Sequence, residues 1–85
     1  MSEVNKMSEI RFEIKKHLGV LSTRESGWTK EANIISWNDG PAKLDIRDWQ
    51  PGREHMSRGV TLTKEEAENL LKILLQVGIE IKEGE

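Results

Sequence analysis

One change of hydrophobic period divides this sequence into two unequal parts. From Ile10 to Leu62, apolar and polar residues alternate in four runs that turn-forming residues separate. From Thr63 to Val77, the apolar residues recur at helical spacing instead. Alternation is typical of strands with one buried face, and a period of 3.6 is typical of an amphipathic helix. The pattern therefore predicts an α+β fold, in which a curved, four-stranded antiparallel sheet is followed by one C-terminal helix.

The four predicted strands cover residues 10–20, 28–37, 42–49 and 59–62. We expect the first to bend at Lys16–His17, where two polar residues interrupt the alternation. Residues 21–27 have turn composition, and Asn38–Asp39–Gly40–Pro41 is a strong hairpin signal. We divide the chain into a flexible N-terminus (1–9), one domain (10–78) and a C-terminal tail (79–85).

The predicted helix begins with a capping box, in which Thr63 is followed by Glu66, and Gly78 is expected to end it. Its apolar stripe is wider than packing on one small sheet requires. Either a second subunit covers the excess, or Ile79 and Ile81 fold back over it. In the first case the helix forms a homodimer interface, for which the expected residues are Leu70, Ile73, Leu74 and Val77.

Alternation in the third strand predicts which of its side chains are exposed. Leu44 and Ile46 share one face, which we expect to form the core beneath the helix. Lys43, Arg47 and Trp49 share the other face, which the helix leaves uncovered. Rings interleaved with basic residues on an open sheet are typical of proteins that bind single-stranded nucleic acid by stacking and phosphate contacts.

The same face also carries Asp45, which either pairs with a neighbouring base and orients it or is repelled to the rim. Of the three tryptophans, we expect Trp49 to be exposed and Trp37 to be in the core, while Trp28 is undecided. In small domains tryptophan is more often core than surface, so an all-core alternative stays open. A surface of Trp and Arg also suits a protein partner, or RNA in place of DNA.

Composition and missing motifs exclude several function classes. The 13 Lys/Arg and 15 Asp/Glu residues give a net charge of −2, although residues 11–58 are mildly basic. There is no cysteine, nucleotide-binding loop or hydrolase motif, and His17 and His55 lie on different elements. No apolar run has the length of a membrane span or a signal peptide. We therefore expect a cytoplasmic protein without catalytic activity, metal or cofactor.

Two ordered motifs resemble a known family. Leu44-Asp45-Ile46-Arg47-Asp48-Trp49, followed by Arg58-Gly59-Val60-Thr61-Leu62-Thr63 and a leucine-rich helix, resembles the transcriptional coactivator family of positive cofactor four. The family's bacterial YdbC-type branch is similar also at Gly27–Asn33, Ser36–Asn38 and Asp45–Pro51. The resemblance covers about residues 10–77.

This resemblance implies a homodimer whose helices meet across a two-fold axis and whose sheets bind single-stranded DNA with little sequence preference. Such a protein acts in transcription regulation, replication, repair or DNA uptake. Arg47, Trp49 and Arg58 match the family pattern, whereas Trp28 and Lys30 match the bacterial branch. The hairpin at 38–41 lacks the aromatic–lysine pair of eukaryotic members. The nucleic-acid-binding residues expected from face and family together are Trp28, Lys30, Lys43, Arg47, Trp49 and Arg58.

Overall fold

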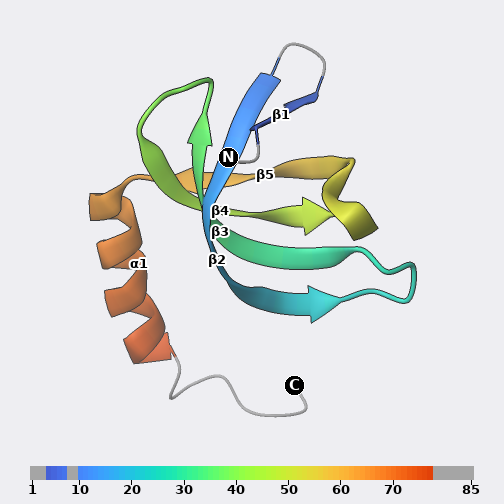
Figure 1. The fold of residues 1–85 in the computed structure, drawn as a ribbon. Helices are drawn as coiled ribbons and strands as arrows, with labels where there is room; N and C mark the ends of the chain where they lie inside the picture. The colour runs from blue at the N-terminus through green and yellow to red at the C-terminus, as the bar shows by residue number, and fades with distance from the viewer. Residues whose placement is uncertain (1–3, 8–9, 78–85) are drawn as a thin grey trace.

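The computed structural model of the chain describes residues 4–7 and 10–77, which form one antiparallel sheet and one helix (Figure 1). The strands pair in chain order, so each contacts its sequence neighbours. This confirms the α+β class, the four predicted strands and the C-terminal helix. The elements are β1 (Val4–Met7), β2 (Ile10–Thr23), β3 (Thr29–Trp37), β4 (Ala42–Trp49), the 3-10 turn η1 (Pro51–Arg53), β5 (Met56–Leu62) and α1 (Lys64–Val77).

Strand β1 was not predicted, and it lies in the segment that we expected to be a flexible N-terminus. It pairs with the first four residues of β2, Ile10 to Glu13. Four residues are too few to establish an alternation, so its sequence carries no strand signal. The predicted tail, residues 79–85, lies outside the described residues.

The predicted hairpin joins β3 to β4. Asn38 and Asp39 have φ angles of 51° and 63°, and the Gly40 N–H donates to the Trp37 carbonyl at 2.8 Å. Two successive positive φ values define the turn whose twist matches that of the flanking strands. The turn fixes the register of the two strands, in which Ser36 lies opposite Ala42.

Strand β2 is longer and more irregular than predicted, because it continues to Thr23. Its pairing with β3 shifts at three places, between Ile14 and Lys16, between His17 and Gly19, and between Val20 and Ser22. Bulges of this kind bend a strand and increase its twist. The bend expected at Lys16–His17 is therefore confirmed, and Figure 1 shows β2 curving along the sheet.

The core lies on the face of the sheet that we predicted to be open. Paired residues share a face, and the register places Ile35 opposite Ile14 and Lys43. On this face, which we call the core face, Phe12, Ile35 and Trp49 have exposed fractions of 1%, 0% and 0%. Phe12 packs on Trp37 and on Trp49, with ring centroids 5.6 and 5.4 Å apart.

The opposite face, which we call the helix face, is only partly covered. Ile46, Val60 and Leu62 of the sheet and Leu70 and Ile73 of α1 line a cavity of about 380 Å³ between sheet and helix. Ile46 is half-buried, and Val60 is 55% exposed. The prediction that Leu44 and Ile46 form the core was wrong. The bulged, curving sheet packs its own core face together, whereas α1 packs mainly against β4 and β5.

The predicted capping box at the start of α1 is confirmed. The Thr63 N–H donates to Glu66 Oε1 at 2.8 Å, and the Glu66 N–H donates to Thr63 Oγ1 at 3.1 Å. These contacts satisfy N–H groups that the helix itself leaves unpaired. Beyond this first turn the helix exposes much apolar surface. More than half of each side chain is exposed for Leu71, Ile73, Leu74 and Leu75.

Candidate nucleic-acid interface

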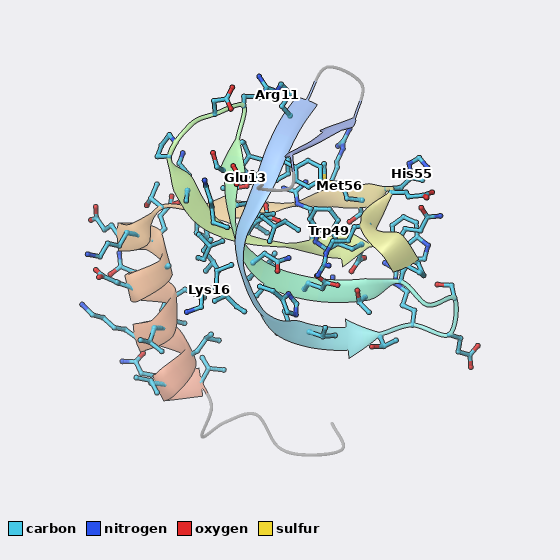
Figure 2. All side chains as sticks on the ribbon, in the orientation of Figure 1. Arg11, Glu13, Lys16, Trp49, His55 and Met56 are labelled. Carbon is cyan, nitrogen blue, oxygen red and sulfur yellow. The ribbon has the colours of Figure 1, made fainter. Side chains whose placement is uncertain are left out.

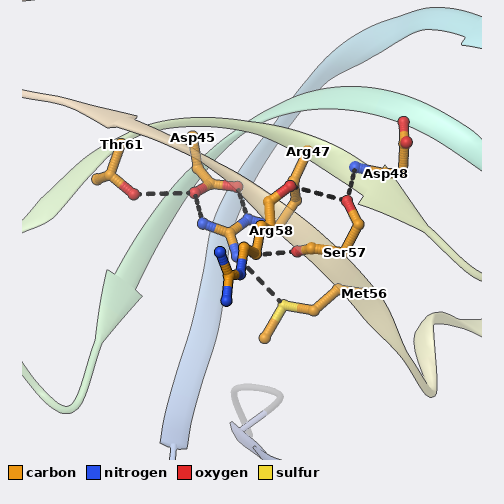
Figure 3. Close-up of polar contacts among 7 residues, drawn as sticks. All are labelled: Asp45, Arg47, Asp48, Met56, Ser57, Arg58 and Thr61. Atoms are coloured by element: carbon orange, nitrogen blue, oxygen red, sulfur yellow. Dashed lines mark hydrogen bonds and ion pairs between the residues drawn. The ribbon is translucent and has the colours of Figure 1, made fainter.

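An aspartate and an arginine of β4 form the centre of the candidate interface on the core face (Figure 3). Asp45 is fully buried, and its Oδ1 and Oδ2 accept hydrogen bonds from Arg47 Nη2 and Nε, both at 2.7 Å. Thr61 of β5 also donates to Oδ1, at 3.1 Å. Residues two apart on a strand point to the same side, so the strand itself brings the pair together. Of the two alternatives for Asp45, pairing with a neighbouring base is therefore confirmed.

The paired Arg47 lies on a tryptophan ring. Its guanidinium carbon is 4.5 Å from the centroid of the Trp37 ring, a stacked cation–π contact. The remaining terminal nitrogen, Nη1, donates to the Ser57 carbonyl at 3.3 Å and contacts Met56 Sδ at 3.8 Å. Only 12% of the Arg47 side chain is exposed. Trp37, which we expected in the core, is half-buried.

Gly59 leaves the space in which Arg47 lies. A Cβ atom at Gly59 would collide with the Arg47 side chain and with the Ile46 carbonyl. Gly59 is also the residue opposite Arg47 in the β4–β5 ladder. Any larger residue at this position would push the guanidinium away from Trp37 or separate the two strands.

The prediction of an exposed Trp49 was wrong. Its exposed fraction is 0%, because Phe12 packs on it and Arg53 lies above its ring at 6.0 Å. Figure 2 shows Trp49 inside the sheet, close to Met56, its partner residue on β5. The turn η1 brings Arg53 back over the ring, which is why alternation along β4 alone did not reveal the burial. A base has no access to Trp49 in this structure.

Arg53 is held in place by a second buried carboxylate. Glu31 is 6% exposed and accepts hydrogen bonds from Thr29 at 2.6 Å, Arg53 at 2.6 Å and Asn33 at 3.3 Å. Burial raises the pKa of Glu31, but the hydrogen bonds from Thr29, Arg53 and Asn33 outweigh it and bring this pKa below its ordinary value of 4.5. Glu31 therefore stays charged at neutral pH.

Two basic residues near the Arg47–Trp37 stack remain exposed. Lys43 shares the core face, since it pairs with Ile35 in the register. Arg58 lies next to Gly59 in β5, and it extends toward the Asp45–Arg47 pair in the view of Figure 3. Neither residue forms an ion pair with a carboxylate within residues 4–7 and 10–77. Their charges are available to an anion.

Comparison with known proteins agrees with the motifs around these residues. The model of a family described as Transcriptional Coactivator p15 (PC4) matches residues 24–73. An uncharacterized protein of Treponema pallidum (strain Nichols) is 39% identical over 72 residues, which are 85% of each chain. This chain belongs to the PC4 family. Membership confirms the resemblance to positive cofactor four and supports a nucleic-acid-binding, coactivator-like role, and the PC4 family is a non-enzymatic one.

The segment that matches the PC4 family contains all six predicted site residues, but the structure does not bring all of them together. Lys30 pairs with Asp48 across β3 and β4, with Nζ 3.4 Å from Oδ1, and Arg24 binds the same carboxylate. This cluster lies on the helix face, because Asp48 is the neighbour of Arg47 in β4. Trp28 precedes β3, at the end of the sheet, and is half-buried.

Sequence reasoning missed two contributors to this PC4-family site, Trp37 as the ring beneath Arg47 and Arg53 as the cover of Trp49. A signal for the first was present. The two-residue hairpin at 38–39 fixes the register, which places Ile35 opposite Lys43 and therefore puts Trp37 on the same face. No comparable signal existed for Arg53, because its partner Glu31 is 22 residues away.

The two histidines lie in different surroundings. His17 Nδ1 lies 2.6 Å from Asn33 Oδ1, and His55 is exposed after η1. Among the described residues, no group of three or more His, Cys, Asp or Glu side chains is arranged to hold a metal ion. Over the same residues, no helix is long and apolar enough to cross a membrane.

Proposed function

We propose that this protein is a non-catalytic, homodimeric, single-stranded-DNA-binding member of the PC4 family. One observation carries the proposal. Lys43 and Arg58 are exposed cations that have no carboxylate partner among the described residues, and Lys43 shares the core face with Trp37, a half-buried tryptophan on which Arg47 lies. Single-stranded nucleic acid offers the matching chemistry, because each nucleotide combines a flat base with one phosphate charge.

In the proposed complex, bases stack on the accessible parts of Trp28 and Trp37, and phosphates contact Lys43 and Arg58. Stacking of a base on an aromatic ring contributes about 1–3 kcal/mol and depends little on sequence. Trp49 is no longer part of the stacking surface, because it is buried. Lys30 lies on the helix face and is therefore outside the proposed binding site. Arg47 lies at the centre of that site.

The proposed dimer uses α1 as the sequence predicted, through Leu70, Ile73, Leu74 and Val77. Ile73 and Leu74 are 53% and 51% exposed, and the cavity that Leu70 and Ile73 line is mainly apolar. An apolar surface of this kind is costly to leave in water. A second copy would cover both the helix and the adjoining part of the sheet.

We propose that the protein acts in the cytoplasm on exposed DNA strands, in transcription regulation, replication, repair or DNA uptake. The test is titration with oligo-dT of about 20 nucleotides, followed by tryptophan fluorescence at two salt concentrations. We expect saturable quenching that weakens with salt, by about 0.7 log units of affinity per log unit of salt for each phosphate contacted.

Two outcomes of this titration count against the proposal. If the protein is dimeric but its fluorescence is not quenched at low salt, the Trp and Arg residues are better explained as a surface that binds another protein. Tighter binding of oligo-rU than of oligo-dT would instead identify RNA as the ligand. A duplex of the same length is the control, and we expect it to bind more weakly because its bases are not free to stack.

A further inference from the structure

We propose that His17 is a further contact of the nucleic-acid site, and that its Nε2 atom donates to a phosphate when the ring has taken up a proton from water. The inference rests on the proposed function and deepens it, because it makes DNA binding stronger as the pH falls. His17 was not among the site residues predicted from the sequence. Three observations support the proposal, which concern the position of the ring, its hydrogen bond and the charges around it.

His17 lies on the core face, beside the centre of the candidate interface. In the register His17 pairs with Asn33, and Asn33 pairs with Asp45, so the three residues form one row across the sheet. Asn33 and Asp45 are fully buried, whereas 45% of the His17 side chain is exposed. Within the described residues, β1 pairs only with the first four residues of β2, so no strand lies on the outer side of His17. The imidazole is therefore the exposed end of a row that contains the Asp45–Arg47 pair.

The amide of Asn33 determines which nitrogen of His17 carries the hydrogen. Asn33 Nδ2 donates to Glu31 Oε1 at 3.3 Å, so Asn33 Oδ1 is the atom that faces His17. This Oδ1 lies 2.6 Å from His17 Nδ1, and an amide oxygen can only accept, so the hydrogen is on Nδ1. In the neutral ring Nε2 then carries a lone pair, which repels a phosphate oxygen. Protonation converts Nε2 into a donor and adds a positive charge, and both changes favour a phosphate.

The carboxylates across the sheet from His17 already have arginine partners. Glu31 Oε1 lies 3.7 Å from His17 Nδ1, but the same oxygen accepts from Arg53 at 2.6 Å. Asp45, the next carboxylate along the row, accepts from Arg47 with both of its oxygens. Neither carboxylate is left to neutralise a protonated His17.

The neighbouring charges on β2 itself are those of two lysines. Lys15 pairs with Glu13 at 3.1 Å, and Lys16 lies opposite Ile34, on the helix face. The one acidic group among these neighbours is therefore paired as well. The charge that His17 gains on protonation is available to an anion from outside the protein.

His17 would complement the permanent cations of the proposed site. Lys43 belongs to the adjacent row on the core face, in which Ile35 pairs with both Ile14 and Lys43. Lys43 and Arg58 are charged throughout the physiological pH range, so their phosphate contacts do not depend on pH. His17 adds a contact only in its protonated form. Binding of DNA at this point of the site is therefore coupled to the uptake of one proton.

The experiment measures the affinity for oligo-dT at about pH 6 and pH 8, between which histidine side chains commonly change charge, and at two salt concentrations. For the wild type we expect about two- to fivefold tighter binding at the lower pH, the range of an exposed ion pair. The salt slope should be steeper there by up to about 0.7, because one more phosphate is contacted. His17→Gln keeps a donor for Asn33 but cannot become charged, so it should lose this difference. His55→Gln is the matched control at an exposed histidine, and it should keep the difference.

His17→Lys tests the same contact without a titrating ring. Lysine is charged at both pH values, so this variant should bind more tightly than the wild type at the higher pH, with a steeper salt slope. Its affinity should also change less between the two pH values. A purely structural role of His17 would not produce this gain, and urea unfolding of the variants checks that each is folded.

The inference and the proposed function can fail separately. Equal pH dependence of binding in the wild type and His17→Gln would overturn the inference and leave DNA binding intact. If the wild type did not bind oligo-dT at either pH, the proposed function would fail. The nitrogen NMR spectrum of the His17 ring without DNA is an independent test, in which we expect the neutral form to carry its hydrogen on Nδ1. A neutral ring with its hydrogen on Nε2 would overturn the assignment of Nε2 as the proton-dependent contact in either case.

Discussion

Phe12 and Trp49 pack with ring centroids 5.4 Å apart on the face of the sheet that α1 does not cover. Their contact joins β2 to β4 across the intervening strand β3. The sheet therefore has a core of its own, built without the helix. This arrangement leaves the apolar side of α1 and the helix face of the sheet available for another surface.

Trp49→Ala should destabilise the protein severely. Removing a fully buried tryptophan leaves a cavity and loses its packing, which costs about 3–5 kcal/mol. Urea unfolding followed by far-UV circular dichroism measures the change. Trp28→Ala is the matched control at a half-buried tryptophan, and it should cost clearly less. Equal unfolding midpoints for the two variants would contradict the buried position of Trp49.

Local signals in the sequence predicted local structure well. The Asn38–Asp39 turn and the Thr63–Glu66 capping box depend on residues at most three positions apart, and both are confirmed. The face that carries the core could not be found in this way. It depends on the curvature of β2, whose three register shifts arise only when the strand pairs with β3.

The candidate site also combines local features that the sequence predicted with long-range contacts that it did not. Alternation placed Asp45 and Arg47 on one side of β4, so their pairing could be anticipated as one of two alternatives. Whether the aspartate is buried depends on Thr61, 16 residues away, which contacts it from β5. The burial of Trp49 depends on η1, which returns Arg53 over the ring. Contacts between strands of this kind have no periodic signature in the sequence.

Glu31 should make stability fall at acid pH. In the folded protein the pKa of Glu31 lies below its ordinary value of 4.5. The charged Glu31 carboxylate therefore stabilises the fold fully above pH 4.5, and this stabilisation is lost as the pH falls through the folded-state pKa. The glutamine of Glu31→Gln cannot take up a proton, so this loss of stability is absent from the variant. Its urea midpoint should be lower than that of the wild type at pH 7 but should decline less below pH 4.5. Urea unfolding at several pH values measures both effects. Parallel profiles for Glu31→Gln and wild type would contradict the prediction, and the exposed Glu25→Gln serves as control.

Thr63→Ala should weaken the start of α1. The variant loses the hydroxyl that accepts from the Glu66 N–H at 3.1 Å, and loss of such a cap costs about 1 kcal/mol. Chemical unfolding should show this loss, with faster amide exchange in the first turn of the helix. Thr23→Ala, at the exposed end of β2, removes the same hydroxyl outside a helix and should have a smaller effect. Unchanged exchange in the first turn of Thr63→Ala would show that the cap does not stabilise α1.

Leu74→Glu should convert the proposed dimer into a monomer. Leu74 is 51% exposed on the apolar side of α1, so a glutamate is tolerated in the isolated chain but would be buried without a partner charge between two helices. Sedimentation equilibrium measures the mass, and we expect at least a hundredfold weaker association, equivalent to about 2.7 kcal/mol. Lys72→Glu is the matched control, because it adds a glutamate to the same exposed helix without removing an apolar side chain. A dimer that survives Leu74→Glu and Ile73→Glu would show that α1 is not the interface, and the uncovered apolar surface would then need a different partner.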